Sequence, residues 1–314
     1  MADLRVRIGS LGLKNPVLVA SGTFGYGNDV PDLSDVNRIG GIVTKSLSMK
    51  PRDGNPPDRI VETAGGMLNS IGLANIGVRH FISEKLPELR KYDTAIVANI
   101  AASSVDEYCD VLSLLEGEEG IHAYEINISC PNVKEGGLSF GTNPAMTAEI
   151  TRRLRKLTKR PLIIKLTPNV AHVSEFARVC AGEGADGVSL INTLVGMAID
   201  HKKWTPKLST VTGGLSGPAI KPVALAKVYE VAQAVKIPIM GIGGIMTTED
   251  AVEFLLAGAT AVQVGTANFI DPSASMKIAE GLGKYCDENG VKQVTELVGA
   301  LKAMTGVSVI HSWL

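Results

Sequence analysis

Residues 237–245, with the sequence IPIMGIGGI, decide between two fold classes. The apolar run Ile237–Gly241 predicts a buried strand, and Gly243 and Gly244 directly follow it. In an open doubly wound sheet, a glycine turn of this kind opens the first βαβ unit. This turn instead comes late in the chain, after the seventh of eight predicted strands, where (β/α)8 barrels hold phosphate groups. We therefore predict an α/β fold of the TIM-barrel type.

The other apolar runs support the same fold, because most are continuous rather than alternating, as parallel strands covered on both faces are. Amphipathic segments that predict helices lie between them, at Pro144–Leu157, Val173–Gly182, Pro218–Val235 and Thr248–Ala257. A TIM barrel needs about 250 residues, so we predict one domain over residues 1–314. The predicted strands are Val17–Ala20, Gly41–Thr44, Ala95–Ala98, Tyr124–Ile128, Leu162–Lys165, Gly187–Ile191, Ile237–Gly241 and Ala261–Val264.

Two further features complete the predicted barrel. Apolar residues alternate on both sides of Gly9–Ser10, which predicts an N-terminal β-hairpin that closes the lower end of the barrel. Three connections, Ser46–Ser70, Ser129–Asn143 and Asn192–Gly217, are longer than usual βα loops. All three leave the C-terminal ends of strands, which form the catalytic face of this fold.

The bulk composition excludes several classes of function. The formal net charge of −1 gives no reason to expect a nucleic-acid partner. No uninterrupted apolar run approaches the roughly 18 residues that a membrane span needs. The N-terminal sequence MADLRVRIGS lacks the continuous apolar region of a signal peptide. We therefore expect a cytoplasmic protein that does not bind membranes.

One of the four cysteines has the surroundings of a reactive thiol. Cys130 follows the predicted strand Tyr124–Ile128, Pro131 ends that strand, and Gly136 and Gly137 give the next loop conformational freedom. The alternative is a buried structural cysteine, which is the commoner fate of this residue. Cys109, Cys180 and Cys286 lie in helical patterns and are predicted to be structural. No C-x-x-C motif occurs and the five histidines are scattered, so we predict no metal site.

Polar residues and glycines collect where the predicted strands end, and in a barrel these ends converge on one pocket. The lysines predict an anionic ligand, the glycine pairs predict a bound phosphate, and the amides predict contacts to a planar, amide-rich molecule. The pocket holds almost no carboxylate, which excludes glycosidase chemistry. A Schiff-base lysine aldolase and a non-catalytic phosphate-binding barrel remain alternatives. The polar residues and glycines at the ends of the predicted strands are Ser21, Lys45, Ser46, Asn99, Asn127, Ser129, Cys130, Lys165, Thr167, Asn192, Thr193, Gly243, Gly244, Gly265 and Thr266.

Several segments, in the same order along the chain, resemble the catalytic subunit of class 1, B-type dihydroorotate dehydrogenases. The resemblance covers nearly the whole chain, and several motifs in the right order are highly specific. The segments are KSLSMKPRDGNPPDRI at Lys45–Ile60, MLNSIGLAN at Met67–Asn75, EINISCPNVKEGG at Glu125–Gly137, IIKLTPNV at Ile163–Val170, INTLVGMAID at Ile191–Asp200, GGLSGPAIKP at Gly213–Pro222, and GIGG with VGTANF between Gly241 and Phe269.

The resemblance implies FMN at the top of the barrel and oxidation of (S)-dihydroorotate to orotate in pyrimidine biosynthesis, with Cys130 as the catalytic base. It implies substrate contacts from Lys45, Asn69, Ser70, Ile71, Gly72, Leu73, Asn127, Asn192 and Thr193. It implies FMN contacts from Ser21, Lys45, Ser46, Asn99, Asn127, Lys165, Ile191, Gly217, Gly243, Gly244, Gly265 and Thr266.

The resemblance also implies a partner. B-type members pair with a subunit that carries FAD and a 2Fe–2S cluster, form heterotetramers with two copies of each subunit, and pass electrons to NAD⁺. A-type members are homodimers that use fumarate, and related enzymes act on other dihydropyrimidines such as dihydrouracil; both remain alternatives. Because the chain has no C-x-x-C motif and no early dinucleotide turn, FAD and the cluster are expected on the partner only. The Asn192–Gly217 connection, which contains Trp204, is a candidate contact region.

Overall fold

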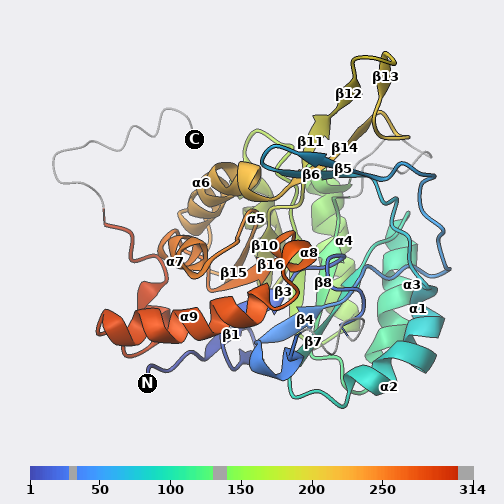
Figure 1. Ribbon diagram of the computed structural model, residues 1–314. Helices are drawn as coiled ribbons and strands as arrows, with labels where there is room; N and C mark the ends of the chain where they lie inside the picture. The colour runs from blue at the N-terminus through green and yellow to red at the C-terminus, as the bar shows by residue number, and fades with distance from the viewer. Residues whose placement is uncertain (28–33, 130–139, 303–314) are drawn as a thin grey trace.

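The computed structural model describes residues 1–27, 34–129 and 140–302 (Figure 1). Eight parallel strands close into a barrel in the order β10-β15-β16-β3-β4-β7-β8-β9, which confirms the predicted fold. Every predicted strand overlaps one of the eight, because apolar side chains on both faces pack against helices outside and against one another inside. The strands are β3 Val17–Val19, β4 Gly41–Val43, β7 Ala95–Ile100, β8 Ala123–Asn127, β9 Leu162–Lys165, β10 Gly187–Leu190, β15 Ile239–Ile242 and β16 Ala261–Val264.

Helices surround the barrel (Figure 1), and local capping explains where several of them begin. The side chain of Asn143 accepts hydrogen bonds from the N–H groups of Ala145 and Met146, so α4 begins where predicted. Helix α7 has Thr247 as its N-cap, and Asp250 completes a capping box with it. The helices are α1 Gly77–His80, α2 Leu86–Leu89, α3 Val105–Glu116, α4 Pro144–Leu157, α5 Val173–Gly182, α6 Lys221–Ala232, α7 Thr248–Leu256, α8 Ala267–Ile270 and α9 Ala274–Glu288.

Two helical segments contain turns that are not α-helical. The segment predicted as the helix Pro218–Val235 is a 3₁₀ turn, Pro218–Ile220, that leads into α6. A π-helical turn, Phe81–Lys85, joins α1 to α2. In the described part of the chain, none of the helices combines the length and apolar character needed to cross a bilayer.

The N-terminal hairpin was predicted correctly. Strands β1, Val6–Ile8, and β2, Leu11–Leu13, pair antiparallel about Gly9–Ser10. Ile8 is fully buried, and a β-carbon added at Gly187, the first residue of β10, would lie 3.0 Å from its side chain. The hairpin therefore packs against the N-terminal ends of the barrel strands, away from the predicted catalytic face.

Two of the three long connections form a second sheet that the sequence did not predict. The connections after β4 and β10 pair in the strand order β11-β14-β6-β5, and this sheet lies across the carboxyl ends of the barrel strands (Figure 1). Its strands are short and rich in glycine, so they lack the alternating pattern that identifies strands. They are β5 Ile60–Thr63, β6 Gly66–Asn69, β11 Leu194–Met197 and β14 Thr212–Ser216.

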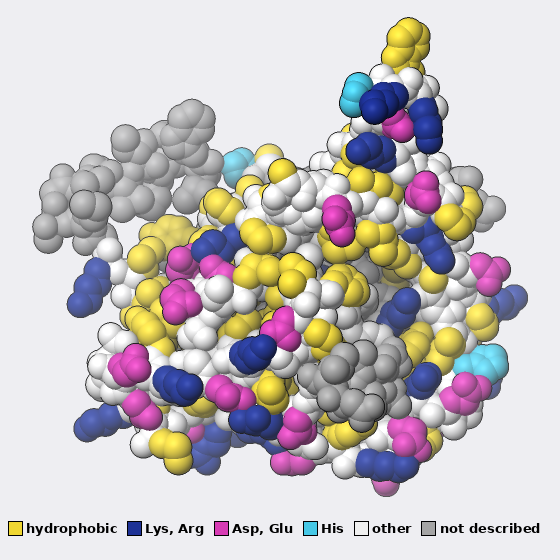
Figure 2. Space-filling model, in the orientation of Figure 1, with side chains coloured by type: hydrophobic (Ala, Val, Ile, Leu, Met, Phe, Trp, Pro, Cys, Tyr) yellow, Lys and Arg dark blue, Asp and Glu magenta, His cyan; other side chains and the backbone are white. Residues whose placement is uncertain are grey.

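An arm extends this sheet away from the barrel. It consists of β12, Ile199–Asp200, and β13, Thr205–Pro206, and stands out from the molecule in Figures 1 and 2. Trp204, at the turn between the two strands, is 89% exposed.

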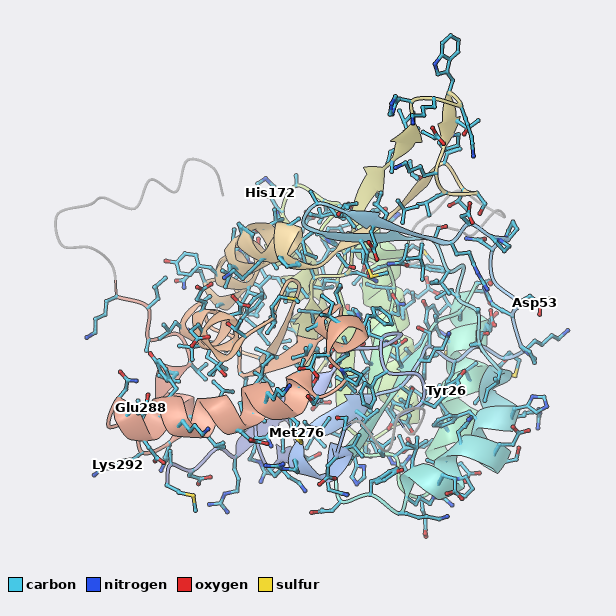
Figure 3. The ribbon with its side chains drawn as sticks, viewed as in Figure 1. Tyr26, Asp53, His172, Met276, Glu288 and Lys292 are labelled. Atoms are coloured by element: carbon cyan, nitrogen blue, oxygen red, sulfur yellow. The ribbon has the colours of Figure 1, made fainter. Side chains whose placement is uncertain are left out.

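Tyr26 fastens the loop after β3 to the end of the long connection that follows β4. Its hydroxyl accepts the N–H of Ile76 at 3.1 Å, and its ring lies 5.8 Å from that of Phe81. Figure 3 shows Tyr26 on the side of the barrel that faces α1. This contact joins the loop after β3 to the start of the helical segment that follows the connection.

Candidate active site

The carboxyl ends of the barrel strands bring three predicted polar residues into contact. The side-chain nitrogen of Asn192 donates a hydrogen bond to the side-chain oxygen of Asn127 at 3.3 Å. The side-chain oxygen of Asn192 accepts the N–H of Thr193 at 2.8 Å. Asn127 is also the register partner of Lys165 on the neighbouring strand β9. These residues therefore form one continuous polar surface at the top of the barrel.

The second sheet places Asn69 over this surface. Asn69 ends β6, and its side-chain nitrogen lies 3.4 Å from the carbonyl oxygen of Gly214 on β14. A β-carbon at Gly214 would overlap the hydroxyl of Thr193, so only glycine lets the sheet approach so closely. The sequence predicted Asn69 as a site residue but not the strand pairing that positions it.

Residues 70–73 continue from Asn69 as a loop with unusual backbone geometry. Gly72 and Leu73 both have positive φ values, 73° and 58°. The hydroxyl of Ser70 is buried and has no hydrogen-bond partner among the described residues. Such a group is costly unless something else satisfies it. Ile71 accepts the N–H of Asn55 through its carbonyl.

A buried polar layer lies below the site, and Glu125 is its centre. The Glu125 carboxylate is fully buried and accepts hydrogen bonds from three side chains. The donors are Asn99 at 2.7 Å, Ser189 at 2.8 Å and Gln263 at 2.6 Å. Asn99 in turn accepts a hydrogen bond from the hydroxyl of Ser46 at 2.6 Å. The layer therefore connects four barrel strands, β7, β8, β10 and β16, with the loop that follows β4.

Glu125 also pairs with Lys165, whose ammonium nitrogen lies 3.5 Å from the carboxylate. Lys165 is only 6% exposed. The sequence predicted that this lysine must face a polar cleft or an anion, and the structure supplies the anion from within the chain. The prediction that the pocket holds almost no carboxylate therefore overlooked Glu125, which pairs with Lys165.

Sequence reasoning could have found Glu125. It stands two positions before Asn127 on the same strand, and residues two apart on a strand share a face. Ser189 and Gln263 are likewise single polar residues inside otherwise apolar strands. A polar residue at such a position has to be satisfied by others of its kind.

Three glycines with positive φ form a cradle on the other side of the site. Gly217, Gly243 and Gly244 have φ values of 96°, 128° and 75°. A β-carbon at Gly244 would lie 2.9 Å from the carbonyl oxygen of Gly217. The hydroxyl of Thr266 donates to that of Ser216, the neighbour of Gly217, at 2.9 Å. The loops after β14, β15 and β16 therefore meet, and their glycine backbone is suited to holding a phosphate group.

The remaining predicted cofactor residues line the same end of the barrel. Ser21 follows β3, and a β-carbon at Gly265 would lie 3.6 Å from that of the adjacent Ala20. Lys45 follows β4, is half-buried, and donates its N–H to the carbonyl of Gly25. Ile191 is buried and its N–H bonds to the carbonyl of Ile242, at the end of β15.

Cys130, the predicted catalytic base, lies outside the described residues. The three cysteines that the structure describes are all poorly suited to react. Burial raises the pKa of Cys180 to about 12, and burial also raises the pKa of both Cys109 and Cys286. Cys180 and Cys286 are buried and Cys109 is half-buried, on helices outside the barrel, so each has a structural position.

The described residues contain no group of three or more His, Cys, Asp or Glu side chains that could bind a metal ion. His172, for example, stands exposed at the N-cap of α5 (Figure 3).

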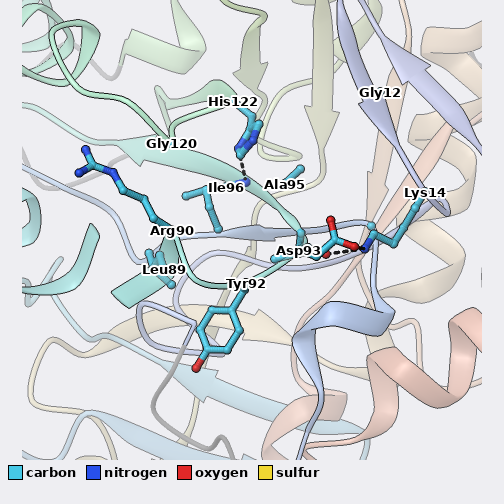
Figure 4. A pocket seen from close by; sticks show the side chains of 12 residues that line it. Gly12, Lys14, Leu89, Arg90, Tyr92, Asp93, Ala95, Ile96, Gly120 and His122 are labelled. Carbon is cyan, nitrogen blue, oxygen red and sulfur yellow. Dashed lines mark hydrogen bonds and ion pairs between the residues drawn. The ribbon is translucent and has the colours of Figure 1, made fainter. Parts of the chain in front are cut away.

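A second hollow of about 440 Å³ lies at the opposite, N-terminal end of the barrel (Figure 4). Its charged groups already have partners. The ammonium of Lys14 lies 2.6 Å from the carboxylate of Asp93, and Arg90 donates to the carbonyl of Glu119. His122 accepts the N–H of Ile96, and burial together with nearby Arg160 lowers its pKa. This hollow therefore offers little to a ligand, and the active site is assigned to the other end.

Comparison with known proteins agrees with the geometry. The family model for dihydroorotate dehydrogenase matches residues 3–285, which include all the predicted site residues. The chain belongs to the dihydroorotate dehydrogenase family. Among its relatives, the catalytic subunit of dihydroorotate dehydrogenase B (NAD(+)) from Geotalea uraniireducens is 56% identical over 299 residues, which are 95% of this chain and 98% of that one.

Other relatives match over a similar length. The subunits of the same name from Pelobacter propionicus and Thermodesulfovibrio yellowstonii are 54% and 53% identical, over 96% of this chain and 99% and 100% of theirs. Within the dihydroorotate dehydrogenase family, the flavin-free aldolase alternative has no support. A Schiff-base lysine has to lose its charge to attack a carbonyl, whereas Lys165 pairs with a carboxylate.

Proposed function

We propose that this chain oxidises (S)-dihydroorotate to orotate in pyrimidine biosynthesis, with FMN bound at the carboxyl ends of the barrel strands. The observation that carries the proposal is the 56% identity, over 95% of the chain, with a catalytic subunit named for this reaction. The cytoplasm, predicted from the sequence, is the proposed location.

The residues present fit FMN. Gly217, Gly243 and Gly244 have positive φ values and no side chains, and their loops meet, which suits a phosphate held by backbone N–H groups. Lys165 offers a nearly buried ammonium for the flavin ring. The full set proposed to hold FMN is Ser21, Lys45, Ser46, Asn99, Asn127, Lys165, Ile191, Gly217, Gly243, Gly244, Gly265 and Thr266.

The substrate is proposed to lie between the barrel and the second sheet. Asn127, Asn192 and Asn69 present amides from below and above, and amides pair well with the N–H and C=O groups of a dihydropyrimidine ring. Lys45 would pair with the substrate carboxylate. The full proposed set is Lys45, Asn69, Ser70, Ile71, Gly72, Leu73, Asn127, Asn192 and Thr193.

The reaction removes a proton from C5 and a hydride from C6 of dihydroorotate, and bound FMN supplies the hydride-accepting chemistry. The chain has to supply a base, and we assign this role to Cys130, which takes the C5 proton on its sulfur. A free cysteine has a pKa of roughly 8.5, so a modest depression makes it a competent base near neutral pH. The other three cysteines have raised pKa values, which leaves Cys130 as the suitable thiol.

Lys165 is proposed to balance the negative charge that develops on the flavin during hydride transfer. A fixed positive charge in a site that excludes water stabilises such charge without reorganisation. Its nearly complete burial strengthens the effect, because little solvent is present to screen it.

Electrons have to leave the chain after each turnover. The relatives are named as catalytic subunits of NAD(+)-dependent enzymes, so we propose a second subunit that carries FAD and a 2Fe–2S cluster and reduces NAD⁺, in a heterotetramer with two copies of each. The arm is the proposed contact region. Its turn exposes Trp204, and aromatic side chains such as tryptophan are enriched at interfaces.

Anaerobic titration of the purified chain with dihydroorotate tests the proposal. The chain should be yellow, and dihydroorotate should bleach the flavin absorbance without any partner. Dihydrouracil, which lacks the carboxylate, serves as the matched control and should bleach it far more slowly. A well-folded, colourless protein that does not bind added FMN would contradict the proposal.

A further inference from the structure

The reaction proposed above has no direct use for Glu125, although the structure surrounds this residue with partners. An ionised carboxylate inside a barrel is costly unless hydrogen bonds and a counter-charge compensate it. Glu125 has three hydrogen bonds and a lysine, and it is fully buried. It therefore cannot touch substrate, and its role has to be exerted through its neighbours.

One carboxylate oxygen of Glu125 contacts two residues proposed to bind the flavin. Its Oε1 accepts from the side chain of Asn99 at 2.7 Å and lies 3.5 Å from the ammonium of Lys165. Its Oε2 accepts from Ser189 and Gln263, which are not among the residues proposed to bind FMN. One oxygen of the carboxylate is thus held by two neutral donors, and the other faces two of the proposed flavin-binding residues.

Lys165 depends on this carboxylate for its charge balance. Among the described residues, Glu125 is the anion that pairs with it, and no hydrogen bond from its ammonium to another described residue is present. The ammonium therefore retains donors for a ligand while the carboxylate offsets much of its charge.

We propose that Glu125 is a positioning residue that holds Lys165 and Asn99 beneath the flavin and, by offsetting the lysine charge, lowers the reduction potential of bound FMN. The inference rests on the proposed function, because it needs FMN at this site. Its physical basis is electrostatic: reduced flavin carries negative charge that an uncompensated Lys165 would favour more strongly. The pair thus sets how readily the reduced cofactor passes its electrons onward.

Glu125→Gln removes the charge and keeps the shape. The barrel can accommodate the new amide, because the side-chain oxygen of Gln263 is buried and has no partner among the described residues. If the Gln263 amide turns over, that oxygen accepts from the new side chain, while the hydroxyl of Ser189 can switch from donor to acceptor. The variant is therefore expected to fold and to retain FMN.

The measurement is the midpoint potential of FMN in the purified chain, together with the Kd of oxidised FMN for the apoprotein. Glu125→Gln should raise the ratio of the affinities for reduced and oxidised FMN about tenfold. This change corresponds to a rise of ~30 mV in the midpoint potential of a two-electron couple. The Kd of oxidised FMN should change much less. A residue with a purely structural role would weaken FMN binding without raising the potential.

Glu230→Gln is the matched control. Glu230 is also a buried glutamate, accepts the N–H of Ser174, and pairs with Lys227 at 3.2 Å, but it lies on α6 outside the barrel. The same chemical change there should leave the flavin potential unaltered. An equal rise in both variants would show that the effect is not specific to Glu125.

Ser189→Ala keeps the proposal testable if Glu125→Gln does not retain FMN. Loss of this hydroxyl removes a hydrogen-bond donor from the Glu125 carboxylate. The negative charge of the carboxylate is then less well stabilised by neutral donors and offsets more of the Lys165 charge, so the midpoint potential of FMN should fall. An unchanged potential in Ser189→Ala, or an unchanged or lower one in an FMN-loaded Glu125→Gln, overturns the inference. If the wild-type chain binds no FMN, the proposed function itself fails, which is a separate result.

Discussion

The ammonium of Lys221 lies 2.6 Å from the carboxylate of Asp250, and this ion pair stands against the glycine loop that follows β15. A β-carbon at Gly244 would lie 2.8 Å from the β-carbon of Lys221. The other oxygen of Asp250 accepts the N–H groups of Met246 and Thr247, at 2.8 and 2.9 Å. One carboxylate therefore joins the start of α6 to the loop and caps α7.

Asp250→Asn should destabilise the chain by about 1.5–3 kcal/mol, the range for hydrogen bonds to a charged group. Burial opposes ionisation of Asp250, but hydrogen bonds from Lys221, Met246 and Thr247 outweigh it and lower the pKa. A lowered folded-state pKa contributes stability that is present above the unfolded-state value of about 3.9. The difference between wild type and variant in urea unfolding should thus persist at neutral pH and shrink as pH falls below about 4.

Glu253→Gln is the control for this prediction. Glu253 pairs with the same lysine at 2.9 Å, but its side chain is 47% exposed. Exposed ion pairs contribute little, so this variant should stay close to wild type. Equal losses in the two variants would show that the lysine pair, and not the hydrogen bonds of Asp250 to the loop, carries the stability.

Gly244→Ala should weaken FMN binding at least tenfold. Gly244 has a φ of 75°, and an added β-carbon would crowd both Lys221 and Gly217. Gly290→Ala provides the comparison, since Gly290 has a φ of 71° and open space around it. Both variants should lose about 1–2 kcal/mol of stability from the left-handed backbone, but only Gly244→Ala should lose FMN affinity, measured by fluorescence titration of the apoprotein.

The contrast between the barrel and the second sheet shows what the sequence could predict. Strands such as Leu162–Lys165 are buried on both faces, so their apolar runs and the helices between them identify the fold. The strands β11 and β14 pair instead through glycines, with Gly196 opposite Gly213, and a β-carbon at either position would collide with a leucine side chain. Glycine carries no hydrophobic pattern, so the pairing of two distant connections could not be read locally.

In the candidate site, too, some residues could be predicted from the sequence and others could not. Lys165 and Asn127 end apolar strands and Gly244 follows one, and these positions alone placed all three at one end of the barrel. The place of Glu125, two residues before Asn127, pointed to the same face, but its partners come from elsewhere in the chain and could not be identified: Asn99 is 26 residues away and Gln263 is 138. Contacts between inward-facing residues of different strands exist only once the barrel has closed.

Lys165→Ala should weaken FMN retention and lower the flavin reduction potential, because it removes the positive charge that favours the reduced cofactor. It also leaves the buried Glu125 without its counter-ion, so some loss of stability is expected. The prediction is checked by a potential titration against a reference dye. An unchanged or higher potential would contradict the role given to Lys165, and an adduct trapped on it by borohydride with a carbonyl substrate would revive the aldolase alternative.

Cys130→Ala should leave FMN binding and folding intact but slow flavin reduction by dihydroorotate, since general base catalysis contributes typically 10²–10⁴-fold. Cys130→Ser should keep a small activity that rises with pH, because a hydroxyl is a poorer base than a thiol. Anaerobic stopped-flow measurement of flavin bleaching tests both variants. Cys180→Ala, at a buried thiol on α5, is the control and should reduce its flavin at the wild-type rate. Reduction of Cys130→Ala at that same rate would show that the base lies elsewhere.

The last prediction concerns the electron acceptor. The sequence contains no C-x-x-C motif and no glycine-rich dinucleotide turn after its first strands, so a second redox centre is expected on a partner. The purified chain should therefore reduce dyes or oxygen, but not NAD⁺, when it is supplied with dihydroorotate.

Adding a subunit that carries FAD and a 2Fe–2S cluster should confer NAD⁺ reduction through a stable complex. Trp204→Ala, at the exposed tip of the arm, should weaken that complex in analytical ultracentrifugation while leaving dye reduction by the isolated chain unchanged. A tryptophan at an interface is often among the residues that contribute most to binding, so a loss of more than about 1 kcal/mol is expected. Unaltered assembly of the variant would move the contact away from the arm. Rapid NAD⁺ reduction by the chain alone, or turnover with fumarate at a comparable rate, would argue for a different electron route and against the proposed B-type assembly.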